Sequence, residues 1–171
     1  TTGREIWQQT GGEIDGFICA VGTGGTLGGV ADALREHNKG VKIGLADPMG
    51  SALYSHFNGN GLHSEGESIA EGIGVSFIPG NLQGLELDFS CRIDDDEALP
   101  LIYDLLKEEG ISVGGSSGIN IAGAMAMARE LGPGHTIVTI LCDAGSRYQS
   151  KLFNPEYLWK RKLPYPHWIA N

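Results

Sequence analysis

The sequence predicts an α/β fold with a mainly parallel, twisted sheet and helices on both faces. Strand-like segments alternate along the chain with segments of helical periodicity. The clearest strand candidates are residues 16–21, a continuous apolar run, and residues 136–142, which are also of the buried type expected of strands covered on both faces. Two glycine-rich turns, residues 22–26 and 114–118, each follow a strand segment and precede a helix. Ligands bind at such turns in α/β sheets, so these two turns are the candidate sites.

Length and composition suit one domain. The chain has 171 residues, of which 41% are apolar and 19% are charged, which is a globular and not a disordered composition. Glycine accounts for 27 residues without a collagen repeat or a low-complexity run. These glycines are therefore expected to serve turns and close backbone approaches.

The strands are predicted from short apolar runs bounded by turn residues. The expected strands comprise residues 16–21, 41–46, 111–113 and 136–142. Residues 47–68 hold many small and polar side chains with little periodicity, and we expect a long loop there; such loops are often functional. The segment after the last strand is rich in proline and aromatic residues and is expected to pack along the surface.

The helices are predicted from apolar spacing and capping residues. Thr2 and Glu5 have the spacing of a capping box, which predicts a helix from Thr2 to about residue 9. Helical spacing predicts three further helices, within residues 27–39, 94–110 and 118–131. Asp94, Asp95 and Asp96 are candidate N-caps for the second of these, and Gly110 is expected to end it.

The charge and the cysteines exclude several classes of function. A formal net charge of −9 argues against nucleic-acid binding and gives no reason to expect an anionic membrane partner, although a local site can still be positive. Cys19, Cys91 and Cys142 form no CxxC pair, and the five histidines lack metal-ligand spacing, so no metal site is expected. No signal peptide or bilayer-spanning stretch is found, and the cysteines fit a reducing, cytoplasmic compartment.

The first glycine-rich turn has the composition of a phosphate-binding loop. Its residues are Gly22, Thr23, Gly24, Gly25 and Thr26. Glycines let successive backbone N–H groups point into one cavity, and the following helix adds partial positive charge. The alternative is a tight strand-to-helix turn without a ligand. The turn does not match the dinucleotide-binding fingerprint, because the third glycine of that motif would fall at Leu27, although Asp47 can mimic the ribose-binding acid. It does not match the phosphate loop of nucleoside triphosphatases, because it contains no lysine.

The second turn makes the pattern specific. Gly114-Gly115-Ser116-Ser117-Gly118, about ninety residues after the first turn, completes a pair that resembles the C-terminal half of the cysteine synthase and cystathionine β-synthase family. Three further segments resemble that family in the same order. They are Thr1-Thr2-Gly3 with Glu5-Ile6-Trp7, Glu71-Gly72-Ile73-Gly74, and Gly145 with Arg147 and Tyr148. The resemblance covers nearly the whole chain and implies the large domain of a pyridoxal-phosphate enzyme of the tryptophan-synthase-β fold type, in incomplete form.

The resemblance also implies roles for residues. The loop from Gly22 to Thr26 would hold the phosphate of pyridoxal phosphate, and Gly72, Ile73 and Gly74 would form a loop over the substrate at the mouth of the site. Ser116 would face the pyridine nitrogen, and its neutral hydroxyl would leave that nitrogen largely unprotonated, which favours loss of a β-leaving group. Helix N-capping is the alternative role for Ser116 and Ser117. Cys142 and Asp143 depart from the proline and serine of many members, and Asp143 is the rival partner for the nitrogen.

The family's Schiff-base lysine has no counterpart here. In the family this lysine and a loop for the substrate carboxylate lie in the N-terminal half, before the segment that the resemblance covers. The six lysines of this chain read as helix-end, strand-edge or tail residues: Lys39, Lys42, Lys107, Lys151, Lys160 and Lys162. Residues 1–171 are therefore expected to be the C-terminal, cofactor-binding part of an enzyme, inactive alone and with no catalytic residue of its own.

The expected activity of the complete enzyme is β-replacement on an activated serine. Cysteine synthesis from O-acetylserine and sulfide is the main expectation. The alternatives are condensation with homocysteine, as in cystathionine β-synthases, and a non-catalytic phosphate- or nucleotide-binding module. The resemblance further suggests a homodimer and a serine acetyltransferase partner.

Overall fold

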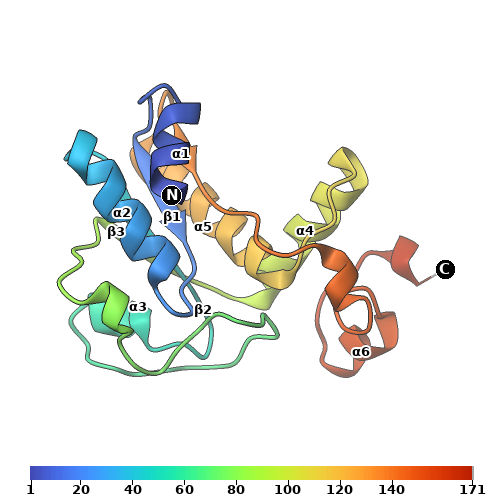
Figure 1. Cartoon of the computed structure of the whole chain (residues 1–171). Coiled ribbons are helices and arrows are strands. Elements are labelled where there is room, and N and C mark those ends of the chain that lie inside the picture. The colour runs from blue at the N-terminus through green and yellow to red at the C-terminus, as the bar shows by residue number, and fades with distance from the viewer. Residues whose placement is uncertain (171) are drawn as a thin grey trace.

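The architecture is a four-stranded parallel sheet with helices on both faces, as the sequence predicts (Figure 1). The computed structural model describes residues 1–170. The strands are β1 (Gly16–Cys19), β2 (Lys42–Pro48), β3 (Phe89–Ile93) and β4 (Ile137–Val138), in the order β3-β2-β1-β4. Every pairing in this sheet is parallel.

Six α-helices and three short 3₁₀ helices complete the described part of the chain. The α-helices are α1 (Thr2–Gln9), α2 (Gly25–His37), α3 (Leu53–Phe57), α4 (Asp95–Glu109), α5 (Gly115–Leu131) and α6 (Pro155–Lys160). The 3₁₀ helices are η1 (Gly80–Leu82), η2 (Gly145–Tyr148) and η3 (His167–Ile169). Within residues 1–170, no helix combines the length and apolar character needed to cross a bilayer.

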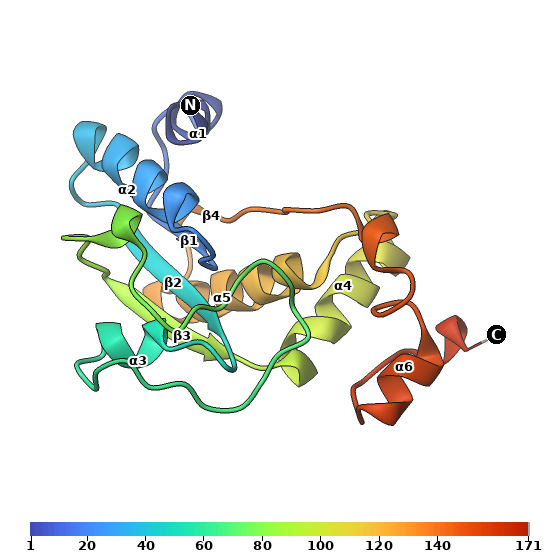
Figure 2. The same ribbon diagram turned by 60° about the horizontal axis from the view of Figure 1, so that its bottom comes forward.

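The two faces of the sheet are covered by different helices (Figure 2). On one face, α2 packs on the sheet and α1 packs on α2, and the apolar residues of the helix predicted within 27–39 are buried there. On the other face, α5 contacts β1, β2 and β3, and Ile119 and Met127 pack beside Ile18. A third cluster joins α4 to the segment after β4, where the Tyr103 hydroxyl donates a hydrogen bond to the Leu152 carbonyl at 2.8 Å. The tail is thus anchored to α4.

The strand order places a topological switch point at β1. From β1 the chain moves to β2 and then β3 on one side, whereas β4 returns to the other side of β1. The pairing of β1 with β4 covers only two residue pairs, Gly16 with Ile137 and Phe17 with Val138. Beyond them the two strands separate, and such a crevice at the carboxyl ends of strands is where open α/β sheets bind ligands.

Several strand predictions need correction. The segment 111–113 is not a strand of this sheet, because it contributes only one antiparallel bridge, from Val113 to Ala144. β4 is far shorter than the predicted run 136–142, since backbone pairing stops where the crevice opens. β3 was not predicted, because its side chains are only partly buried at the sheet edge and include polar residues.

Several helix predictions also need correction. The loop expected over residues 47–68 contains α3, and β2 extends into it as far as Pro48. Helix α1 has Thr1 as its N-cap and makes no side-chain capping bond, so the predicted capping box is not formed. Helix α5 begins at Gly115, so most of the second glycine-rich turn is helical. The prediction for α4 is confirmed: the Asp94 carboxylate accepts from the Glu97 N–H at 2.8 Å, and Gly110 ends the helix with φ +70°.

Candidate cofactor site

The first glycine-rich turn joins β1 to α2 and leaves backbone donors free. Gly24 is the N-cap of α2 with φ +78°, a conformation that favours glycine. The first helical bond runs from the Gly28 N–H to the Gly24 carbonyl at 2.9 Å, so the N–H groups of Gly25, Thr26 and Leu27 have no acceptor within the helix. The Gly25 N–H makes one long contact, to the Thr23 Oγ1 at 3.5 Å. Thr23, Gly25 and Thr26 are exposed. These donors, with the positive end of the helix dipole, suit an anion.

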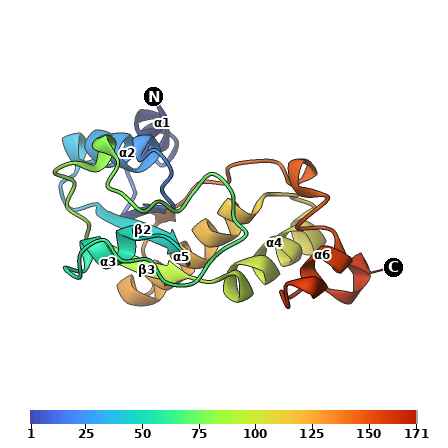
Figure 3. The ribbon, with the colours of Figure 1, turned by 90° about the horizontal axis from the view of Figure 1, so that it is seen from below.

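Two glycines of this turn are required by close neighbours. A Cβ on Gly22 would lie 2.3 Å from the Gly72 carbonyl oxygen, and one on Gly24 would lie 2.8 Å from Leu82. The Gly74 N–H donates to the Val21 carbonyl at 2.9 Å. Residues 72–74 therefore lie directly against the turn, and Figure 3 shows their segment passing the ends of β2 and α5 before it returns beside α2.

A cavity of about 230 Å³ opens between the carboxyl ends of β1 and β4. Its lining includes predicted residues from three separate segments: Gly22, Thr23, Thr26, Gly72, Ile73 and Cys142. It also includes four residues that were not predicted: Cys19, Ala20, Asn120 and Ile140. The structure thus brings the first turn, the 72–74 loop and the segment after β4 into one site at the switch point.

The second glycine-rich turn borders this cavity without lining it. Ser116 is 5% exposed in the first turn of α5, and its Oγ has no hydrogen-bond partner among residues 1–170. The Ser117 Oγ accepts from the Cys142 N–H at 2.9 Å, which places the start of α5 beside the lining. The N-cap of α5 is Gly114, without a side-chain capping bond, so the capping alternative for both serines is wrong.

Asp143 is engaged elsewhere. Its carboxylate accepts from the Tyr148 hydroxyl at 2.7 Å and from the Arg147 guanidinium at 3.1 Å. The Asp143 hydrogen bond, followed by burial, raises the pKa of Tyr148. The motif of Gly145, Arg147 and Tyr148 therefore holds this carboxylate, whereas the Ser116 hydroxyl has no competing partner.

Asn120 is the site residue that sequence reasoning missed. It is 1% exposed in α5, and its amide contacts Ala20 and Ile140 on the two sides of the crevice. A signal was present, because Asn120 is a polar residue between two isoleucines in an apolar stretch of the helix. Buried amides require hydrogen-bond partners, so such a position often marks an organised contact.

The comparisons with known proteins agree with this arrangement. A family model described as pyridoxal-phosphate dependent enzyme matches residues 1–143. This chain belongs to the pyridoxal-phosphate-dependent enzyme family. Cysteine synthase 1 of Neurospora crassa is 46% identical over 168 residues, which are 95% of this chain and 45% of that protein. The O-acetylserine-dependent cystathionine β-synthase of Bacillus subtilis is 35% identical over 151 residues, 88% of this chain and 47% of that protein.

A solved structure shares the fold as well. The crystal structure of the O-acetylserine-dependent cystathionine β-synthase from Helicobacter pylori superimposes with a TM-score of 0.79 at 35% identity, over 88% of this chain and 47% of that one. The chain spans about half the length of the curated relatives it matches. The predicted family and fold type are thus confirmed for this segment.

The residues at the cavity fit a cofactor that carries a phosphate. The side of the cavity at Gly22 and Thr23 has free N–H groups at a helix N-terminus, and a side chain on Gly22 or Gly24 would collide with its surroundings. The lining also holds a neutral thiol: burial, and after it electrostatic repulsion from Cys142, raises the pKa of Cys19 to about 12. A cofactor with an anionic end and a largely neutral ring suits this lining.

The lysines of this family member lie away from the cavity. All six are among the described residues, and none lines it. Four are paired with carboxylates near the surface: Lys42 with Asp88, Lys107 with Glu108, Lys151 with Glu71, and Lys160 with Glu156. The Lys151 pair joins the tail to the residue that precedes the 72–74 loop, so it helps to hold that loop.

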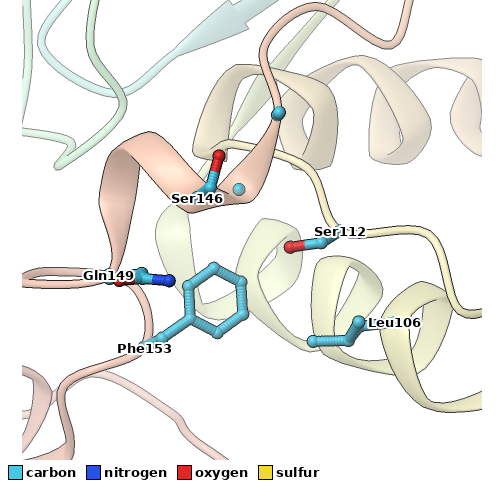
Figure 4. A pocket seen from close by; sticks show the side chains of 7 residues that line it. Leu106, Ser112, Ser146, Gln149 and Phe153 are labelled. Atoms are coloured by element: carbon cyan, nitrogen blue, oxygen red, sulfur yellow. The ribbon is translucent and has the colours of Figure 1, made fainter.

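A second cavity, of about 540 Å³, lies between α4 and η2 (Figure 4). In Figure 4 the side chains of Ser112 and Phe153 are directed toward the same space. The full lining is Leu106, Ser112, Ala144, Gly145, Ser146, Gln149 and Phe153. None of these residues belongs to a glycine loop at the start of a long helix or carries a charge. The larger cavity is therefore a poorer match to a phosphate than the cavity at the switch point.

Proposed function

We propose that this chain is the cofactor-binding part of an enzyme that performs β-replacement on an activated serine. Cysteine synthesis from O-acetylserine and sulfide is the proposed activity of the complete enzyme. The observation that carries the proposal is the cavity at the switch point, where a glycine loop with free N–H donors meets the 72–74 loop and Cys142. The relatives named cysteine synthase support the choice of reaction.

The geometry supports the proposed contacts. Residues Gly22 to Thr26 hold the phosphate through their backbone N–H groups and the two threonine hydroxyls. Ser116 faces the ring nitrogen, because its Oγ is without a partner while the Asp143 carboxylate is occupied by Tyr148. Cys142 contacts the ring at the end of the cavity, beside Asp143. Residues 72–74 cover the substrate and exclude water.

The cofactor and the residues of this chain make different contributions to the reaction. When bound, pyridoxal phosphate supplies an electron sink for charge at the α-carbon of the substrate. The neutral Ser116 hydroxyl meets the ring nitrogen without keeping it protonated, so less charge collects in the ring. Loss of a β-leaving group is then favoured over transamination.

We further propose that residues 1–171 act with an N-terminal part that supplies the cofactor-bearing lysine and the loop for the substrate carboxylate. The position of all six lysines outside the cavity supports this division, as does the share of the relatives that the chain spans. A homodimer and a serine acetyltransferase partner are proposed from the family resemblance. Three cysteines without disulfides support a cytoplasmic location.

Condensation with homocysteine is the second candidate. It is favoured by the similarity to the O-acetylserine-dependent cystathionine β-synthases of Bacillus subtilis and Helicobacter pylori. Sulfide and homocysteine differ in size and charge, so supplying each in turn with O-acetylserine and identifying the product separates the two activities.

The test is reconstitution. The 171-residue chain is expected to form no cysteine from O-acetylserine and sulfide, and activity should appear when the N-terminal half of the Neurospora crassa relative is added. A matched control adds the same half to a chain with Gly25→Asp, which should stay inactive. Steady turnover by the chain alone, with borohydride trapping cofactor on one of its lysines, would contradict the proposed division.

A further inference from the structure

Asn120 occupies a buried position where an amide side chain destabilises the fold unless its donor and acceptor both form hydrogen bonds. It lies in the second turn of α5 with 1% exposure, between Ile119 and Ile121. A buried amide without hydrogen-bond partners destabilises the folded state. The side chain must therefore find partners on whatever elements α5 crosses, and these are the ends of β1 and the segment after β4.

The amide spans the crevice between those two segments. Its Oδ1 accepts from the Ala20 N–H at 2.7 Å, and its Nδ2 donates to the Ile140 carbonyl at 2.7 Å. The Nδ2 also lies 3.6 Å from the Cys142 Sγ. Ala20 immediately precedes Val21 and the phosphate loop, whereas Ile140 leads to Cys142. One side chain thus connects both ends of the proposed cofactor cavity.

This bridge begins where the backbone ladder stops. The last backbone pair of β1 and β4 joins Phe17 and Val138. One residue further on, the Thr139 Oγ1 donates to the Ile18 carbonyl at 2.6 Å. At Ala20 and Ile140 the longer amide of Asn120 takes over. The strands are therefore held apart by side chains of increasing reach, and the cavity occupies the opening.

We propose that Asn120 is a positioning residue that sets the separation between the phosphate loop and the Cys142 end of the cavity. This inference rests on the proposed function, because it assumes that the cofactor fills that cavity. Neither an apolar side chain of similar size nor a carboxylate meets both demands at this place. Leucine would leave the Ala20 N–H and the Ile140 carbonyl without partners, and aspartate would set a carboxylate oxygen against the Ile140 carbonyl.

The experiment compares the binding of a short and a long ligand to the 171-residue chain. Inorganic phosphate needs only the loop, whereas pyridoxal phosphate needs the loop and the Cys142 end together. Dissociation constants for both are measured by calorimetry with wild type, Asn120→Ala and Asn120→Ser. Met127→Ala is the control, since it removes a buried side chain from the same helix outside the cavity. Circular dichroism fixes a temperature at which all variants are folded.

Both Asn120 variants are expected to weaken pyridoxal phosphate about tenfold while the phosphate constant changes by less than about twofold. Serine keeps a donor and an acceptor but cannot reach both segments, so a smaller structural disturbance should give the same selective loss. Met127→Ala should lower the melting temperature without changing either constant.

Two results would overturn the inference. If both ligands bound more weakly by the same factor, Asn120 would act on the phosphate loop alone. If both dissociation constants were unchanged in a folded Asn120→Ser chain, Asn120 would not set the separation between the two ends of the cavity. Failure of the proposed function has a different signature: wild type would then bind neither ligand, or would bind phosphate and pyridoxal phosphate equally.

Discussion

The two glycine-rich turns have similar sequences and opposite structures. Residues 22–24 form an open loop before α2, Thr23, Gly25 and Thr26 are exposed, and the Thr26 and Leu27 N–H groups have no acceptor within the helix. Residues 114–118 are buried and mostly helical. The first turn uses glycine to present backbone donors, whereas the second uses it to let neighbours approach. Glycine content therefore does not by itself identify a binding loop.

The neighbours of the second turn explain its glycines. A Cβ on Gly114 would lie 2.5 Å from the Tyr148 ring, and one on Gly118 would lie 2.5 Å from the Ala98 carbonyl of α4. The family-like motif around Tyr148 thus packs directly on the start of α5. This packing sets Ser117 beside Cys142, so the second turn borders the cavity through its position and not through free N–H groups.

The strongest test of the contrast is Gly25→Asp in the first turn. Its Cβ would meet only ordinary contacts at 3.7 Å, so the fold should persist, whereas Gly24→Asp would also suffer from φ +78° and from Leu82. Charge-assisted bonds are worth roughly 1.5–3 kcal/mol each, and the carboxylate would also repel the phosphate. Pyridoxal phosphate should bind at least about 100-fold more weakly by calorimetry. Gly29→Asp, which faces open space on the same helix, is the control and should change binding little.

The second test is Gly118→Ala, which adds one methyl group where α4 and α5 meet. Overpacking against the Ala98 carbonyl should lower the free energy of unfolding by about 2 kcal/mol in urea titrations. Gly29→Ala has open space and should be neutral or stabilising by up to about 1 kcal/mol. If Gly118→Ala left stability intact and instead removed phosphate binding, the contrast between the turns would be wrong.

The third test separates Ser116 from Asp143 as partner of the ring nitrogen. Ser116→Ala should weaken pyridoxal phosphate about fivefold, the value of one neutral hydrogen bond, while inorganic phosphate binds as before. Asp143→Asn should change the same constant by less than about twofold, because its carboxylate is held by Arg147 and Tyr148. If Asp143→Asn weakened pyridoxal phosphate binding more than Ser116→Ala did, Asp143 would be the partner of the ring nitrogen.

The smallest expected effect is a loss of stability at low pH, and it concerns Asp88, which belongs to neither turn. Burial opposes ionisation of Asp88, but hydrogen bonds from the Ile43 N–H, Lys42 and Arg35 outweigh it and leave its pKa below the usual 3.8. A depressed pKa means that the folded state favours the ionised form. Its stabilisation is therefore present above pH 3.8 and is lost as pH falls through the lower folded value. Asp88→Asn should remove this loss, which is about 1 kcal/mol or less, in denaturation curves measured between pH 5 and about 2.

The predictions from sequence were most accurate where one local cause dominates. Asp94 and Gly110 delimit α4 because capping and a left-handed glycine act within a few residues. The apolar run of β1 is buried as expected. The predictions failed where an element distant in the sequence determines the local structure. β4 ends early because Asn120 and Thr139 replace backbone pairing, and β3 is a strand because β2 lies beside it.

The sequence by itself determined the fold class, the family resemblance and the loop after β1, since apolar periodicity and glycine spacing are local properties of the chain. Tertiary structure alone decided which residues meet at the site. Gly72 lies on Gly22, the Ser116 hydroxyl stays free while Asp143 is bound, and Asn120 spans the crevice. These facts depend on contacts between residues up to about a hundred positions apart, and such contacts follow from packing and strand order, which no local pattern encodes.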